Sequence, residues 1–193
     1  MTPGQTRATQ VVRLQPGINR AAWFMDSQRL FHRNSLDPSA TVFVDVASTA
    51  GAYLRITPLR WKVRRPGSQS IKMVPPGVGL QPLGLRVGSS ADSGLNTDGF
   101  LIRDLGWPGL HGTPRISTAA QWFNETAEVW GFDCKAIMES SGSTYFIGAY
   151  MLRQWSEFLK RSLRMLVGFG ALPPINVEAR IVLPKGARWA AAS

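Results

Sequence analysis

The stretch from residue 144 to residue 183, TYFIGAYMLRQWSEFLKRSLRMLVGFGALPPINVEARIVL, decides the fold class of this chain. Apolar side chains recur every three or four residues from Thr144 to Val167, which predicts a long amphipathic helix with most of its Arg and Lys residues on the opposite side. Ser143 is placed to cap the start of this helix, and the segment GFGALPP (168–174) ends it. Apolar and polar residues then alternate from Ile175 to Leu183, which predicts a strand.

The sequence before this helix has the patterns of several strands. Residues 115–123 and 127–134 flank the turn residues 124–126 and predict a hairpin, across which Trp122 and Trp130 are expected to approach. Further strands are predicted at Thr41–Val46, Ala52–Leu59, Leu80–Val87 and Asp98–Leu105. A strand after a hairpin and a long helix predicts an α+β fold, in which one amphipathic helix covers a mostly antiparallel sheet.

The length of 193 residues fits one domain, and 44% of the residues are hydrophobic, which is enough for a core. Residues 1–38 are polar and weakly periodic, and we interpret them as an irregular arm or the remnant of an upstream element, with a short helix possible over 19–33. The single α+β domain then covers residues 39–193. Within it, residues 62–98 are rich in Gly, Pro and Ser and indicate a long loop, and Pro58 is expected near a strand end or on an edge, where no ladder donor is needed.

The chain contains one cysteine, Cys134, so no disulfide forms within it. This favours a reducing compartment, and we expect a cytoplasmic protein in which Cys134 is a small core residue and not a catalytic thiol. The longest apolar-rich stretch, residues 143–170, is interrupted by five charged residues. The sequence therefore predicts no contact with a membrane.

Positive charge is concentrated in the first half of the chain. The net charge is +10, and residues 1–91 hold 12 Lys and Arg against 3 Asp and Glu, whereas residues 92–193 hold 10 against 9. No acidic residue occurs between Asp45 and Asp92. Such an imbalance favours a polyanionic partner, because every neutralised phosphate releases counterions.

The segment 55–72 is the candidate nucleic-acid-binding site. It places an aromatic ring among cations, which would allow base stacking beside phosphate contacts. The candidate residues are Arg55, Arg60, Trp61, Lys62, Arg64, Arg65 and Lys72. The alternative interpretation is a solvated loop on a basic protein.

Catalytic patterns are weak throughout the sequence. His32 and His111 have no metal-ligand spacing, and no cofactor motif is present, so no cofactor and no metal site are predicted. One arrangement is similar to the acid and acid-x-Lys pattern of metal-dependent nucleases, namely Asp45 with Glu178 and Arg180, although Arg replaces the Lys.

Four fragments occur in an order that resembles one protein group: TVFVDVASTAGAYLRITPLR (41–60), LQPLGLRVGSSADSGLNTDGFL (80–101), STAAQWFNETAEVWGFD (117–133) and PPINVEARIVLPKGARWA (173–190). They are similar to the C-terminal region of bacterial Schlafen/Alba-type proteins, which are described as DNA-binding or ATP-binding. Asn96 and Gly99 match an Asn-x-x-Gly strand start, while residues 124–128 replace the Asn-Gly turn with a longer loop. The N-terminal Schlafen-like domain has no counterpart here, so the resemblance implies an accessory domain and transfers no catalytic residue.

Three functions follow from these observations. The first is a non-enzymatic accessory module that binds or positions nucleic acid through the basic segment. The second is a protein-interaction or scaffold domain, which includes a homo-oligomer. The third is a divergent metal-dependent nuclease.

Overall fold

The computed structural model of the protein describes residues 30–33, 41–44, 50–62, 64–75, 78–84, 91–95, 99–106 and 115–190. Its elements in chain order are β1 (Leu30–Arg33), β2 (Thr41–Val44), β3 (Gly51–Trp61), α3 (Ser68–Lys72), β4 (Asp92–Leu95), β5 (Gly99–Gly106), β6 (Arg115–Phe123), β7 (Val129–Asp133), β8 (Ile137–Ser140), β9 (Ser143–Phe146), α4 (Gly148–Gly168), β10 (Ala171–Val182) and β11 (Arg188–Trp189).

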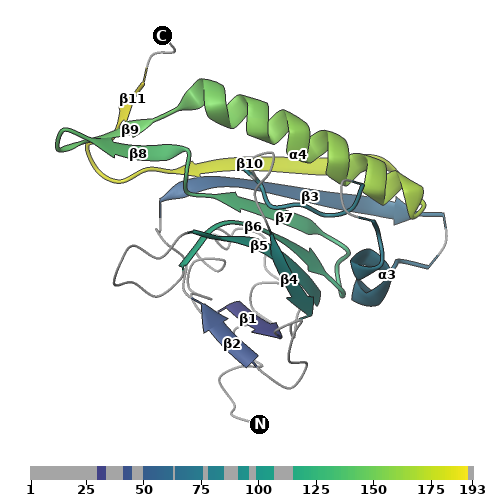
Figure 1. Ribbon diagram of the computed structural model, residues 1–193. Coiled ribbons are helices and arrows are strands. Elements are labelled where there is room, and N and C mark those ends of the chain that lie inside the picture. The colour runs from purple at the N-terminus through teal and green to yellow at the C-terminus, as the bar shows by residue number, and fades with distance from the viewer. Residues whose placement is uncertain are drawn as a thin grey trace, which may run out of the picture.

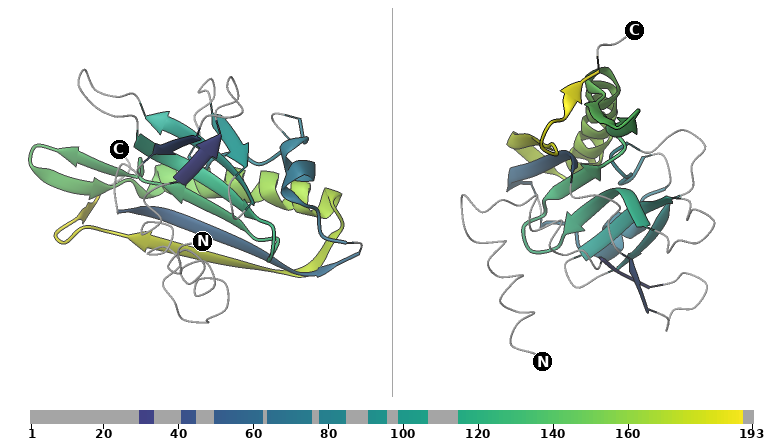
Figure 2. Two further views of the ribbon diagram at one scale, coloured as in Figure 1. Left: turned by 90° about the horizontal axis from the view of Figure 1, so that it is seen from below. Right: turned by 90° about the vertical axis from the view of Figure 1, so that its left-hand side faces the viewer.

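Six strands form the main sheet in the order β10-β3-β7-β6-β5-β4, and every neighbouring pair in it is antiparallel. The long helix α4 runs along one face of this sheet, and the β1–β2 pair lies on its other side (Figure 1). A smaller sheet with the order β11-β9-β8 extends beyond one end (Figure 2). The predicted α+β class with a mostly antiparallel sheet and one long helix is confirmed.

The main core lies between α4 and the sheet. Met151, Phe158, Met165 and Leu166 are the buried apolar residues of the helix. Phe158, Met165 and Leu166 meet the alternate residues of the strands that point toward α4, which include Leu54, Ile56, Phe100, Ala120, Trp122 and Val129. Met151 packs in a second cluster with Ala52, Ala136 and Phe146. Gly131 lets Phe158 approach the sheet, because a Cβ at this position would lie 2.8 Å from the ring of Phe158. Burial of these side chains holds the helix in place.

Pro58 lies within β3 and not at its end. The pairing of β3 with β7 covers Ala52 to Ile56, so Pro58 lies past the last β7 partner and pairs with Ile175 of β10 alone. At such a position one side of the strand needs no ladder donor, as the sequence predicted.

The start of the long helix was predicted wrongly. Residues 143–146 form β9, which pairs with β8, and α4 begins only at Gly148. The N-cap residue is Ile147, without a side-chain cap, so Ser143 does not cap the helix. Tyr145 and Phe146 continue the helical apolar spacing by chance, but cross-strand pairing with Met138 and Ile137 decides their conformation.

Other predicted elements change in extent. The hairpin is confirmed as β6 and β7, and the last strand begins at Ala171 instead of Ile175. Residues 80–84 form no strand, and 85–90 lie outside the described residues. The stretch 62–98 is not a continuous loop, because it contains α3 and β4. Residues 30–33 are a strand and not part of a helix, and the predicted domain boundary at 38/39 falls between the paired strands β1 and β2.

Trp122 and Trp130 do not approach each other across the hairpin. Trp122 pairs with Val129, and Trp130 pairs with Gln121. Because neighbouring residues of a strand point to opposite faces, the two indoles lie on opposite sides of the sheet. Trp122 faces α4 in the core, whereas Trp130 packs with Phe123 on the other face, with ring centroids 5.1 Å apart.

Candidate nucleic-acid interface

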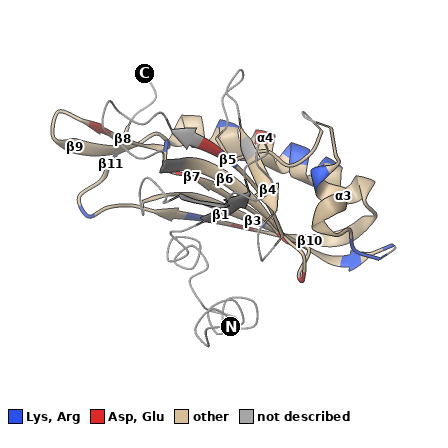
Figure 3. Cartoon of the chain, turned by 60° about the horizontal axis from the view of Figure 1, so that its bottom comes forward, with Lys and Arg blue, Asp and Glu red and all other residues tan. Residues whose placement is uncertain are grey.

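Five cations of the predicted site lie together where β3 leaves the sheet and the chain continues into α3. Arg60, Lys62, Arg64, Arg65 and Lys72 are all exposed. We call these five residues the basic end. In Figure 3 the Lys and Arg positions beside α3 are seen at this end of the sheet.

The end of β3 and α3 hold the backbone of the basic end in place. Ile71 of α3 is 1% exposed and packs into the main core, so Lys72 next to it is directed to the surface. The Lys62 N–H donates to the Gly170 carbonyl oxygen at 2.7 Å, which ties the end of β3 to the segment after α4. The cations therefore project from anchored backbone.

The turn between β6 and β7, which is about sixty residues later in the sequence, forms hydrogen bonds with the same region. Asn124 Oδ1 accepts a hydrogen bond from the Ser68 N–H at 2.8 Å. Arg65 Nη1 donates to the Glu125 carbonyl oxygen, also at 2.8 Å. This turn, which is longer than a two-residue hairpin turn, thus supplies two contacts to α3 and the loop before it.

A shallow, open depression lies between these parts and has a volume of about 880 Å³. It is lined by residues 64–70 with Asn124, Glu125 and Phe169, and of these described lining residues Glu125 alone is acidic. Arg64 and Arg65 stand on its border with the hydroxyls of Ser68 and Ser70. Its open shape and its cations suit an extended anionic chain better than a small apolar ligand.

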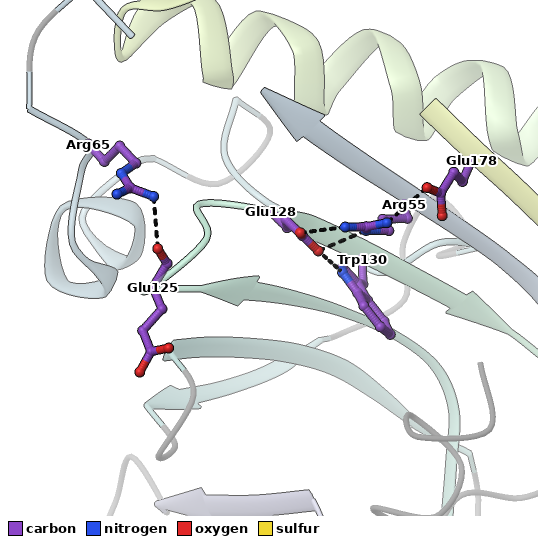
Figure 4. Close-up of polar contacts among 6 residues, drawn as sticks. All are labelled: Arg55, Arg65, Glu125, Glu128, Trp130 and Glu178. Atoms are coloured by element: carbon purple, nitrogen blue, oxygen red, sulfur yellow. Dashed lines mark hydrogen bonds and ion pairs between the residues drawn. The ribbon is translucent and has the colours of Figure 1, made fainter. Parts of the chain in front are cut away.

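Two cations of the basic end, Arg60 and Arg65, donate hydrogen bonds to uncharged main-chain carbonyl oxygens. Arg60 donates from Nε to the Pro173 carbonyl oxygen at 2.9 Å, and its Nη2 donates to the same oxygen. Figure 4 shows that the carboxylate of Glu125 points away from Arg65, whose contact is with the main chain. A carbonyl oxygen orients a guanidinium without cancelling its charge, so these bonds position the cations and leave the local potential positive.

Arg55 is in a different environment from the other predicted residues. It lies on β3, five residues before Arg60, or about 17 Å away along an extended strand. Its guanidinium donates to Glu128 from Nε at 2.8 Å and from Nη2 at 2.6 Å, and to Glu178 from Nη1 at 2.8 Å (Figure 4). Burial lowers the pKa of Arg55, but the bonds and charges of Glu128 and Glu178 outweigh this and raise its pKa. Two carboxylates of the rear half of the chain therefore neutralise this arginine.

Trp61 packs against the core. Its ring meets that of the fully buried Trp122 edge-on, with centroids 6.3 Å apart and an interplanar angle of 86°. Trp61 itself is half-buried and belongs to the rim of the main cluster. This packing accounts for the aromatic residue among the cations.

The residues of the nuclease hypothesis are not brought together among the described residues. Asp45 lies outside them, and Glu178 is on the outer face of β10, bonded to Arg55. In the described part of the chain, no group of three or more His, Cys, Asp or Glu side chains is arranged to hold a metal ion.

Two other ionisable groups, Asp133 and Cys134, lie at the far end of β7. Burial, and next the charge of Asp133, raise the pKa of the Cys134 thiol to about 12, so at neutral pH it is protonated and a poor nucleophile. Burial also raises the pKa of Asp133 to about 6, although the Lys135 N–H donates to its Oδ1 at 2.7 Å. The Tyr150 side chain and the charge of Lys135 favour the ionised form of this carboxyl but do not outweigh its burial.

Three residues of the interface were not predicted from sequence, namely Asn124, Glu125 and Phe169. They reach it by strand pairing and by the position of the helix end, and nothing in their local sequence marks them. The length of the stretch 124–128, which exceeds that of a two-residue hairpin turn, was the one available signal.

None of the helices in the described part of the chain has both the length and the hydropathy needed to span a bilayer. Comparison with models of protein families, with curated proteins and with solved structures finds no match to this chain.

Proposed function

We propose that this protein is a non-enzymatic module that binds nucleic acid through the basic end. The observation that supports this is the contrast between two environments of arginine. Arg55 is neutralised by two carboxylates, while Arg60 and Arg65 are held by carbonyl oxygens and keep their charge exposed. Lys62, Arg64 and Lys72 extend the same surface.

The ligand class follows from the chemistry of this surface. Exposed Arg and Lys side chains on a backbone anchored in the core match a row of phosphates, which carry no sequence information. We therefore expect binding with little sequence preference. Because Trp61 is packed against Trp122, base stacking on its ring is not part of this proposal.

The proposal is consistent with the Schlafen/Alba-type resemblance, which implies an accessory domain that assists nucleic-acid-directed activity. The expected location is the cytoplasm, in keeping with the single cysteine. In such a setting the module would hold a nucleic-acid strand for a separate catalytic protein or domain.

The test is fluorescence anisotropy with labelled single-stranded and double-stranded oligonucleotides. The triple variant Lys62→Ala, Arg64→Ala, Lys72→Ala changes exposed side chains only, and we expect it to weaken binding by 10-fold or more at 100 mM salt. The control is the triple variant Lys160→Ala, Lys185→Ala, Arg188→Ala, which removes the same charge elsewhere. Equal loss in both variants would show that net charge, and not the basic end, drives binding. Absence of nucleic-acid binding by the wild-type protein would contradict the proposed function.

A further inference from the structure

The strand β10 is a long, open edge of the main sheet. It has 12 residues and pairs with β3 on one side, and the described residues provide no strand on the other side (Figure 2). The opposite edge, β4, has only four residues. On an edge strand every second residue directs its N–H and C=O outward, so β10 presents a template for a further strand.

Part of this edge lacks the usual protection against pairing. Pro173 and Pro174 block its first residues, where the register with β3 also shifts. From Ile175 to Val182 no proline or register shift follows. Val177, on the side of the sheet covered by α4, is 46% exposed, and Leu183, just beyond the strand, is 38% exposed. This half of the edge offers apolar side chains beside open backbone groups.

The sequence of β10 is complementary to itself. Odd-numbered residues face α4, because Val177 pairs with the core residue Ile56, and even-numbered residues face away. Glu178 and Arg180 are therefore two positions apart on one face, and both are exposed. An antiparallel copy centred on Ala179 would set Glu178 of one chain opposite Arg180 of the other, twice.

We propose that two copies of this chain pair antiparallel along β10, with Ala179 of one copy opposite Ala179 of the other. The same register sets Val177 opposite Ile181 and Ile175 opposite Leu183, so apolar residues meet on the α4 side. The main sheet then continues from one subunit into the next.

Neighbouring registers are disfavoured by charge. A pairing centred on residue 178 would place Glu178 opposite Glu178, and one centred on residue 180 would place Arg180 opposite Arg180. Like charges directly opposite each other on a sheet are destabilising. A slip by one residue would turn the apolar face of one strand to the polar face of the other. Centring on Ala179 is thus the arrangement that satisfies both charges and both faces.

The pairing also extends a charge row within the subunit. Glu128 just before β7, Arg55 on β3 and Glu178 on β10 already alternate in sign. Glu178 uses Oε1 for Arg55 and is 63% exposed at its side chain. Arg180 of the second copy would add a positive charge at the open side of Glu178, which continues the alternation.

The dimer separates its two basic ends. Arg60 pairs with Leu172, seven residues from the centre at Ala179. The same distance applies on each side of the centre, so the two basic ends lie at opposite ends of the paired β10 strands, about 50 Å apart. The dimer is independent of nucleic-acid binding and is tested without it.

The first test is the mass of the full chain by sedimentation velocity over a range of concentrations. We expect a species of twice the chain mass of 21.2 kDa, and a monomer at every concentration would overturn the proposal.

Charge variants then test the register. Glu178→Arg leaves two positive charges on the edge, and Arg180→Glu leaves two negative ones, so each variant alone should lose at least 10-fold in dimer affinity. An equimolar mixture restores opposite charges at both positions and should form the heterodimer. Circular dichroism confirms that each variant is folded. Dimers of undiminished affinity in both single variants would show that another surface is used.

Cross-linking gives a second readout of the register. In a Cys134→Ser background, Ala179→Cys places two thiols directly opposite each other, and we expect a disulfide-linked dimer under mild oxidation. The matched control is Val177→Cys, because residues 177 of the two copies would lie about 14 Å apart along the strands and could not be bridged. Equal cross-linking of both variants, or of neither, would contradict the pairing centred on Ala179.

Discussion

Arg55 and Glu128 form a two-pronged ion pair between β3 and the residue before β7, with Nε to Oε2 at 2.8 Å and Nη2 to Oε1 at 2.6 Å. The same carboxylate accepts the indole N–H of Trp130 at 2.8 Å. Because Glu128 is 5% exposed, this pair lies inside the fold, whereas the second partner of Arg55, Glu178, is at the surface. One arginine therefore serves one buried and one exposed carboxylate.

This asymmetry predicts different costs for the loss of each carboxylate. We expect Glu128→Ala to lower the free energy of unfolding by about 3 kcal/mol, because the Arg55 guanidinium then keeps only the exposed Glu178 and the indole N–H of Trp130 loses its acceptor. Glu178→Ala should cost less than about 1 kcal/mol, as exposed ion pairs do. Urea denaturation of both variants measures the difference. Equal losses would mean that Arg55 reaches solvent when Glu128 is absent.

Trp61 should matter for stability and not for binding. Its contact with Trp122 leads us to expect that Trp61→Ala lowers the free energy of unfolding by about 2–3 kcal/mol. Anisotropy at a temperature where the variant is fully folded should give the affinity of the wild-type protein for an oligonucleotide. If the folded variant binds the oligonucleotide several-fold more weakly than the wild-type protein, the Trp61 ring does contribute to binding.

The salt dependence of binding should report the number of phosphate contacts. If the five cations of the basic end each neutralise one phosphate of a duplex, the logarithm of the affinity falls with the logarithm of salt with a slope of about −4.5. Each single alanine variant should reduce this slope by about 0.9. An unchanged slope in Arg64→Ala would exclude that residue from the contact, and Arg55→Lys serves as the control because its position lies outside the basic end.

The buried carboxyl of Asp133 predicts a pH-dependent stability. Its pKa is raised from 3.8 to about 6, so between these values the folded protein holds a proton that the unfolded chain releases. The free energy of unfolding should therefore decrease as the pH rises from about 4 to 6, by an amount on the order of 2–3 kcal/mol. Asp133→Asn stays neutral, so it should match the wild-type protein near pH 4 and exceed its stability near pH 7.

Urea denaturation of both proteins from pH 4 to pH 7.5 makes this comparison. The difference between the two proteins isolates Asp133 from the other groups that titrate in this range. A difference that does not change with pH would show that the carboxyl is ionised in the folded protein over this whole range.

Gly131 should control how closely α4 approaches the sheet. A Cβ there would lie 2.8 Å from the Phe158 ring and 2.9 Å from Leu83 Cβ, so we expect Gly131→Ala to cost about 1–3 kcal/mol. Gly168→Ala is the matched control, because a Cβ at the end of α4 meets no atom within 4 Å and should leave stability unchanged or raise it slightly. Thermal unfolding of both variants tests the pair, and similar melting temperatures would contradict the close packing.

The sequence by itself determined the elements whose pattern is local and strong. The periodic apolar residues of α4, the alternation in β10 and the turn between β6 and β7 all led to the correct element, because each depends on contacts along one segment. The concentration of cations in residues 55–72 was likewise visible. What periodicity could not show was the conformation of residues 143–146, where pairing with β8 prevails over a pattern that also fits a helix.

Only the tertiary structure divided those cations into two groups. Arg55 and Arg60 look alike in the sequence, yet strand pairing brings Glu128 and Glu178 to the first and a proline carbonyl oxygen to the second. The same pairing order left β10 at the edge of the sheet, which no local pattern reveals. Charge compensation and edge position depend on partners up to 123 residues away, and a single segment holds no information about them.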